Sequence, residues 1–361
     1  MQNIAPKKKP KSIKRLILAF CAITFIIIGF VVAKTAGPKT WHAILEMRAS
    51  FLFLALLLGI VMIFINAVIV EMLTASASGK KIGFLYAIET VLSYYFLSSI
   101  SPTVTGGEPI MIYMLTRRGV PFGKALTVAL LRGFLVLLVI IIAAPLIIYF
   151  RGELIQNVHL RNFFYSIALL VSLVIIFLAY AFYNPRKIER MIHALRMKMG
   201  RWRMLAHHAE TLEKKFDRWI EDFGSSIKHF FKYQKKVILA VVVLTLLSIG
   251  ANYLIAYAIL AGLGFYISPL DVVMIQFVLY FFLYFTPTPG GSGVAEGGAY
   301  IMFAAYVPNH LLGIFIVLWR FFTTYLWMIM GGIFIARHIG LGIIETMPST
   351  IQEGDEGDLI K

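Results

Sequence analysis

The sequence predicts an all-α, polytopic membrane helix bundle of six full spans plus two re-entrant helical hairpins, arranged as an inverted repeat. Hydrophobic residues make up 60% of its 361 positions, against about half in soluble globular chains. Several continuous apolar runs approach the roughly 20 residues with which a helix crosses a bilayer. Two Gly- and Pro-rich interruptions with matching flanks then predict the repeat.

The predicted full spans are the longest continuous apolar runs. Continuous runs favour helices over a barrel, whose strands alternate and are about half as long. A Lys-rich N-terminus precedes the first run, which is long for a signal peptide, so we expect an uncleaved span. The six spans are Leu16–Ala33, Phe51–Val70, Val128–Phe150, Phe163–Phe182, Val237–Leu263 and Leu311–Ala336.

The formal net charge of +16 lies mostly in loops beside these runs. This is the positive-inside pattern of a membrane protein, so no nucleic-acid partner is expected. It predicts a multi-pass protein of the cell's cytoplasmic (inner) membrane with both termini in the cytoplasm. Residues 1–340 form one predicted transmembrane domain, and residues 341–361 form an acidic cytoplasmic tail.

The polar stretch 184–236 is also predicted to be cytoplasmic. Its apolar residues recur at helical spacing, which fits amphipathic helices on the membrane surface or a helical hairpin packed on the bundle. It is also the surface through which a partner or a second copy would bind. The chain has one cysteine, Cys21, and no metal or cofactor is expected.

Two further apolar segments are interrupted in the middle. Tyr86–Leu115 is broken by residues 101–109, and Asp271–Tyr306 by residues 286–298. Each half is too short to span, and non-helical backbone at membrane depth needs protein or a wet cavity around it. We therefore expect two re-entrant hairpins.

The two interruptions match each other. Ser101-Pro102-Thr103 aligns with Thr286-Pro287-Thr288, and each is followed by a Gly-Gly pair and then a glutamate. The repeat halves are about 50–150 and 237–338. The span count makes them inverted, a plan that places transporter substrate sites near the midplane where the breaks meet.

The flanks of the interruptions match as well. Asn66 lies 36 residues before the first proline, and Asn252 lies 35 before the second. Arg132 lies 30 residues after the first, and Arg320 lies 33 after the second. We expect the two asparagines to hydrogen-bond the broken backbones.

An arginine inside a span costs at least about 2.5 kcal/mol, so Arg132 and Arg320 are candidate ligands for a lipid phosphate. The alternative is structural pairing with Glu108 or Glu296, which we expect across the two repeats. The Gly-rich turns offer N–H groups as a second phosphate site, unless glycine only permits the turn. The expected substrate-binding residues are Arg132, Arg320, Glu108, Glu296, Gly106, Gly107, Gly290, Gly291, Ser292, Gly293, Thr103 and Thr288.

Aromatic clusters flank both breaks. They include Tyr94, Tyr95, Tyr280 and Tyr284. We expect them to pack against lipid or neighbouring helices, with a lining for acyl chains as the alternative.

The stretches 101–108 and 286–297 resemble the lysylphosphatidylglycerol synthase transmembrane region family, the flippase-like domain of the multiple peptide resistance factor. The resemblance covers about Leu16 to Gly340. It implies membrane lipid translocation or the handling of lipid-linked glycans. Resistance factors carry a soluble aminoacyl-transferase domain after this region, whereas only about twenty polar residues follow Arg337 here, so lysyl transfer is not expected.

Three functions stay open at this point. The first is a translocase that moves a phospholipid or a lipid-linked phosphate headgroup through a central polar cavity. The second is an intramembrane enzyme acting on a lipid-linked glycan or aminoacyl-lipid, for which only the two glutamates and the hydroxyls of Ser101, Thr103, Thr286 and Thr288 are available. The third is an accessory or scaffold subunit acting through 184–236. No residue is assigned a catalytic role.

Overall fold

The computed structural model describes residues 45–101, 106–154 and 234–338, with four isolated positions between 162 and 169. Within these ranges every regular element is helical. The predicted span Leu16–Ala33, nearly all of Phe163–Phe182, the segment 184–236 up to Tyr233 and the tail 341–361 lie outside the described residues.

Four helical stretches are long and apolar enough to cross a bilayer. Three are α3 (Ala49–Ser78), α6 (Phe122–Phe150) and α10 (Lys235–Gly262). The fourth is continuous from α13 (Asn309–Arg320) through a π-helical turn (Phe321–Tyr325) into α14 (Leu326–His338). Four of the six predicted apolar runs are therefore confirmed as helices of spanning length.

Both predicted interruptions fall between pairs of short helices. In the first pair, α4 (Phe84–Ile100) is followed by α5 (Glu108–Arg117). In the second, α11 (Pro269–Tyr284) leads through a 3-10 turn (Pro289–Gly291) into α12 (Val294–Phe303). The order long helix, two short helices, long helix thus occurs twice along the chain.

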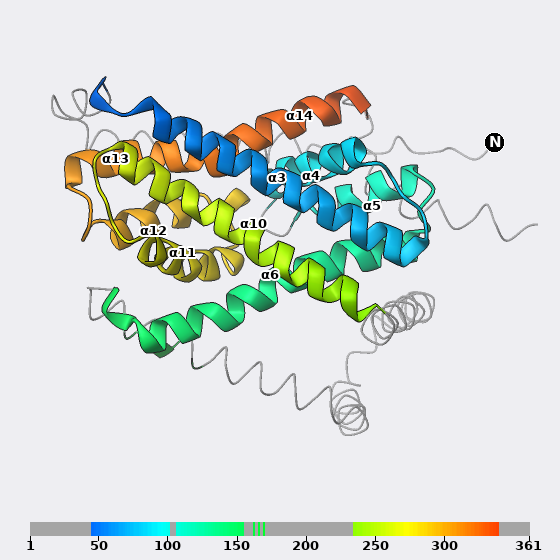
Figure 1. Cartoon of the computed structure of the whole chain (residues 1–361), viewed down its shortest axis with the longest axis horizontal. Coiled ribbons are helices and arrows are strands. Elements are labelled where there is room, and N and C mark those ends of the chain that lie inside the picture. Colours follow the sequence, from blue (N-terminus) through cyan, green and yellow to red (C-terminus); the bar gives the residue numbers. More distant parts are fainter. Residues whose placement is uncertain are drawn as a thin grey trace, which may run out of the picture.

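Helices α3 and α10 pack along each other in the middle of the bundle (Figure 1). They are antiparallel, because the Arg48 amide at the start of α3 donates to the Gly262 carbonyl at the end of α10, at 3.4 Å. The outer ends of α4 and α5 lie where α3 ends. The outer ends of α11 and α12 lie at the opposite end of the bundle, where α10 ends (Figure 1).

The remaining contacts are reciprocal between the two halves of the chain. Helix α14 packs on α4, and α6 packs on α11, so the last helix of each half covers the first short helix of the other. The outward face of α6 carries exposed apolar side chains every fourth residue: Phe134, Leu138, Ile142 and Leu146. Such a face suits lipid rather than water.

The contact between α14 and α4 is a close backbone approach. A Cβ atom added at Gly331 would overlap the carbonyl of Leu92, and one at Gly332 would lie 3.1 Å from the Phe96 ring. Because lipid supplies no hydrophobic driving force between helices, small residues at such contacts provide the packing energy.

Replacing Gly331 with alanine should lower the midpoint of thermal unfolding in detergent, because the added methyl group forces α14 away from α4. Overpacking of this kind costs about 1–3 kcal/mol. Gly250→Ala in α10 is the matched control, since an added Cβ there meets nothing within 4 Å. Equal midpoints for the two variants would contradict the close contact.

Candidate functional site

The two helix breaks touch each other inside the bundle. The backbone N–H of Gly290, in the second break, donates to the carbonyl of Ser101, in the first, at 3.3 Å. The Ser101 hydroxyl donates in turn to the carbonyl of Gly106 at 3.2 Å. Segments nearly 190 residues apart in the sequence therefore satisfy one another's backbone groups.

Arg320 is held by an ion pair with Glu296. Its Nε lies 2.8 Å from Glu296 Oε1, and the two side chains are 4% and 0% exposed. The guanidinium also donates to the carbonyl of Gly290 at 3.1 Å and to the hydroxyl of Thr324 at 3.3 Å. The expectation of pairing across the repeats is wrong here, because both partners belong to the second half.

The second carboxylate oxygen of Glu296 caps α12. It accepts a hydrogen bond from the Gly293 N–H at 2.7 Å, which places the carboxylate between the helix start and the arginine. A negative charge at a helix N-terminus is favourable because of the helix dipole. This contact is local in sequence, because Glu296 is the third residue of α12 and its side chain reaches back to the residue just before the helix.

Arg132 makes its hydrogen bond and its ring contact with neutral groups, and the Glu108 carboxylate acts on it only at longer range. One of its Nη atoms donates to Asn66 Oδ1 at 2.8 Å, and its guanidinium lies 4.3 Å from the centroid of the Tyr94 ring. Its Nε is buried without a hydrogen-bond partner. Among the described residues no carboxylate lies within ion-pair distance of Arg132.

Glu108 does not mirror Glu296. It is half-buried and lies against α6, where a Cβ atom added at Gly133 would be 3.1 Å from its Oε1. Pro102 and Pro287 occupy matching positions in the sequence. Arg132 and Arg320, which follow them, nevertheless have different hydrogen-bonding partners. One half carries an ion pair, and the other carries an arginine bonded to an amide.

The asparagines do not bind the broken backbones as predicted. The Asn66 amide donates to the Ser248 hydroxyl at 2.6 Å and to the carbonyl of Met62 at 2.9 Å. The Asn252 amide donates to the Tyr280 hydroxyl at 3.3 Å. Among the described residues neither asparagine bonds a break, because Asn66 bonds within α3 and to α10, and Asn252 on α10 bonds a tyrosine of α11.

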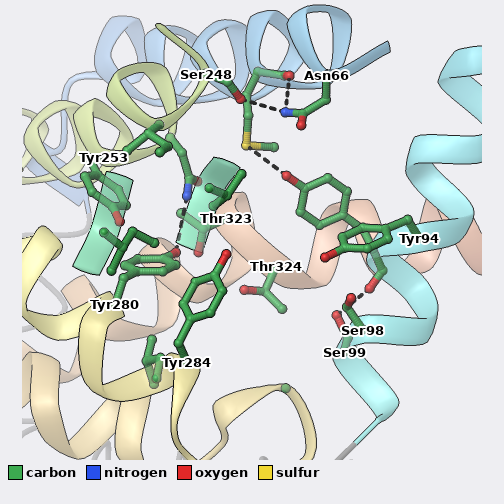
Figure 2. A pocket seen from close by; sticks show the side chains of 18 of the residues that line it. Asn66, Tyr94, Ser98, Ser99, Ser248, Tyr253, Tyr280, Tyr284, Thr323 and Thr324 are labelled. Atoms are coloured by element: carbon green, nitrogen blue, oxygen red, sulfur yellow. Dashed lines mark hydrogen bonds between the residues drawn. The ribbon is translucent and has the colours of Figure 1, made fainter. Parts of the chain in front are cut away.

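A cavity of about 150 Å³ lies between the two halves. Figure 2 shows tyrosine, serine and threonine side chains around it, from helices of both halves. Of the twelve predicted substrate-binding residues, Arg132, Arg320 and Gly290 line it. The glutamates and the other described members of the set do not, and Thr103 lies outside the described residues.

The predicted phosphate site in the second glycine turn is not available in this conformation. Its four N–H groups donate within the protein, from Gly290 to Ser101, from Gly291 to Thr288, from Ser292 to Pro289, and from Gly293 to Glu296. The glycines are required instead by the backbone, whose φ is positive at positions 290, 291 and 293 (58°, 69° and 91°).

Among the cavity's tyrosines, the sequence analysis did not name Tyr253, and for the other four it gave a lining role only as the alternative. Tyr94, Tyr95, Tyr253, Tyr280 and Tyr284 all line it, where packing against lipid or other helices was expected for those that were singled out. The repeat itself contained a signal. Tyr95 precedes Pro102 by seven residues, and Tyr280 precedes Pro287 by seven.

Among the described residues, the cavity wall provides guanidinium and hydroxyl groups. Ser101 and Thr286 hydroxyls donate to backbone carbonyls. Across the described part of the chain, no three His, Cys, Asp or Glu side chains come together as metal ligands. The chemistry this set performs best is anion binding.

Spanning helices, paired helix breaks and a polar cavity inside the bundle define a multi-pass integral membrane protein. The chain belongs to the family described as the lysylphosphatidylglycerol synthase TM region, whose profile matches residues 17–331. It is 26% identical over 329 residues to a UPF0104 membrane protein of Archaeoglobus fulgidus, covering 88% of this chain and 94% of that protein. The resemblance seen in the sequence is thereby confirmed.

Removing the charge of Glu296 should destabilise the protein far more than removing that of Arg132. Glu296→Gln leaves the buried Arg320 uncompensated, which costs about 3–5 kcal/mol. Arg132→Gln loses a hydrogen bond to a neutral amide and a contact with the Tyr94 ring, together worth about 1–3 kcal/mol. Thermal unfolding in detergent measures both.

The double variant Glu296→Gln/Arg320→Gln tests the pairing directly. We expect it to be more stable than either single variant, because no buried charge is left alone. Additive losses in the double variant would show that the two side chains do not depend on each other.

Proposed function

We propose that this chain moves a lipid across the bilayer by binding its phosphate headgroup at Arg132 in the central cavity. The observation that carries the proposal is a buried guanidinium that borders this cavity, hydrogen-bonds a neutral amide and leaves its Nε without a hydrogen-bond partner. An arginine in a membrane interior is costly when no carboxylate contacts it directly, and such residues usually face a substrate or ion path. A lipid phosphate would supply an ionic partner in direct contact with the guanidinium.

Guanidinium geometry supports phosphate in particular. Arginine presents a planar fork that binds two phosphate oxygens at once, and Nε of Arg132 has no other partner. A cavity of about 150 Å³ is well above the roughly 10–15 Å³ that one water needs. It would hold a headgroup while the acyl chains stay in the surrounding lipid.

We further propose that the two halves form an inverted repeat, with six spans and two re-entrant hairpins that enter from opposite faces. Three features support this arrangement: the antiparallel α3 and α10, the reciprocal contacts of α14 with α4 and of α6 with α11, and the helix pairs opening at opposite ends. Rocking of one half against the other would then expose the cavity alternately to each side.

The charges at the two ends support an orientation. The end at which α3 stops carries Lys80, Lys81, Arg117, Arg118, Lys124, Lys235 and Lys236. The other end carries Arg48 and Arg151 together with three acidic residues, Glu46, Glu153 and Asp271. By the positive-inside rule the first end would face the cytoplasm.

Arg132→Gln should abolish lipid movement by the purified protein in liposomes. The assay follows how the accessibility of the headgroup to a membrane-impermeant reagent changes as lipid crosses the bilayer. Arg132→Lys should restore little, because the bidentate contact is lost. Arg151→Gln is the control, since Arg151 is half-exposed and pairs with Glu153 and Asp271 at the end of the bundle. Unimpaired movement by a folded Arg132→Gln protein would refute the proposal, and a chemically altered lipid would indicate an enzyme.

Orientation is tested by single cysteines placed at Arg118 and at Asn309, in a chain whose own Cys21 is replaced by alanine. Both positions are exposed, at opposite ends of the bundle. In sealed vesicles or intact cells, a membrane-impermeant thiol reagent should label Asn309 from outside and Arg118 only after permeabilisation. Labelling of both from one side would contradict the hairpins entering from opposite faces.

A further inference from the structure

We infer that Glu108 is a proton-binding site of the transport cycle, so that a lipid phosphate and a proton cross the membrane together. The inference rests on the proposed function, because it concerns the anion that Arg132 would bind. It gives a role to a carboxylate that lipid binding at Arg132 leaves unused, and it makes the proton gradient the source of energy for lipid movement.

Glu108 lies immediately behind the cavity wall. It is the first residue of α5 and is half-buried. Its Oε1 reaches α6 at Gly133, where an added Cβ atom would be 3.1 Å away. Gly133 lines the cavity and follows Arg132 in the sequence. The absence of a side chain at this glycine therefore leaves room for the carboxylate beside the cavity.

The carboxylate of Glu108 is free of the contacts that fix the one of Glu296. Glu296 pairs with Arg320 at 2.8 Å and caps α12. Among the described residues Glu108 forms no ion pair, and the hydrogen bond that it accepts comes from the N–H of its own residue. Glu108 can therefore gain a proton without breaking an ion pair.

Titratable groups from three helices interact electrostatically with Glu108. They are Arg132 on α6, Tyr94 on α4 and Tyr284 on α11, and all three line the cavity, where Figure 2 shows both tyrosines. Arginine keeps its proton in proteins, and tyrosine ordinarily loses its own only near about pH 10. Within this group the carboxylate is the member that can bind and release a proton near neutral pH.

The charges of this group link the proton to the anion. With the cavity empty, an ionised Glu108 acts on the charge of Arg132 at longer range. A phosphodiester bound at Arg132 adds a second negative charge, and like charges repel strongly where water is excluded. A nearby anion favours the protonated form of a carboxylate. Glu108 therefore takes up a proton when the lipid binds and releases it when the lipid leaves on the other side.

The first test measures proton uptake when the purified full chain, in weakly buffered detergent, binds dihexanoyl phosphatidylmethanol, whose headgroup is a methyl phosphodiester. A pH indicator should report about one proton taken up per lipid bound near pH 7. Because the bound state holds the additional proton, binding should tighten by up to about tenfold for each unit by which the pH is lowered.

Two variants assign the proton to its site. Glu108→Gln, which resembles the protonated carboxyl, should bind the probe without proton uptake and with an affinity that no longer changes with pH. Glu153→Gln is the matched control, because Glu153 is an exposed carboxylate that pairs with Arg151 at the end of the bundle. It should take up protons as the unaltered protein does.

The second test imposes a pH gradient across phosphatidylcholine liposomes that contain the protein and long-chain phosphatidylmethanol. The anionic lipid should accumulate in the leaflet on the alkaline side, which is followed through the surface charge of the vesicles. With Glu108→Gln the lipid should distribute between the leaflets without responding to the gradient. Liposomes without protein provide the background rate.

The outcomes separate this inference from the proposed function. Probe binding to the unaltered protein without proton uptake overturns the inference even if Glu108→Gln does not fold, and so does proton uptake that Glu108→Gln leaves unchanged. If probe binding depends on Arg132 in either case, the proposed function stands. Absence of probe binding, or binding that Arg132→Gln leaves unchanged, would refute both.

Discussion

The fold depends on one constraint, that a helix broken inside a bilayer must satisfy its free backbone and charged groups within the protein. Each unsatisfied group costs several kcal/mol in hydrocarbon. The Arg320–Glu296 pair meets this cost at the second break. Glu296 caps α12 through Gly293 and pairs with Arg320, which also binds the carbonyl of Gly290. One ion pair therefore ties the turn, the short helix and the long helix together.

The first half meets the same constraint without an ion pair. Arg132 bonds Asn66, and Asn66 bonds Ser248 on the other half, so the guanidinium is positioned by neutral dipoles, with the Glu108 carboxylate acting on it only at longer range. This difference between two matching positions is what makes a binding function plausible at one of them. A fully paired arginine serves structure, whereas an arginine held only by amides and a ring face is still able to attract an anion.

The packing of the halves places these groups around a shared space. Helix α14 packs on α4 through Gly331 and Gly332, and α6 packs on α11, so the last helix of each half covers the first short helix of the other. The cavity forms where the breaks meet, and the Gly290–Ser101 hydrogen bond holds them in contact. Movement between the halves would have to change this bond or the packing beside it. The close approach at Gly331 packs α14 tightly against α4.

The sequence by itself determined the membrane class, four described long helices, the positions of both breaks and the residues that break them. These features follow from local properties, namely continuous hydrophobicity and the backbone preferences of glycine and proline. Only the tertiary structure decided that Arg320 pairs within its own half, that the turn's N–H groups are already bonded, and that tyrosines such as Tyr95 and Tyr280 face the cavity. Those outcomes depend on how each helix is rotated about its axis and on which helix packs against it. Apolar runs that are hydrophobic on every side carry no periodic signal for that rotation.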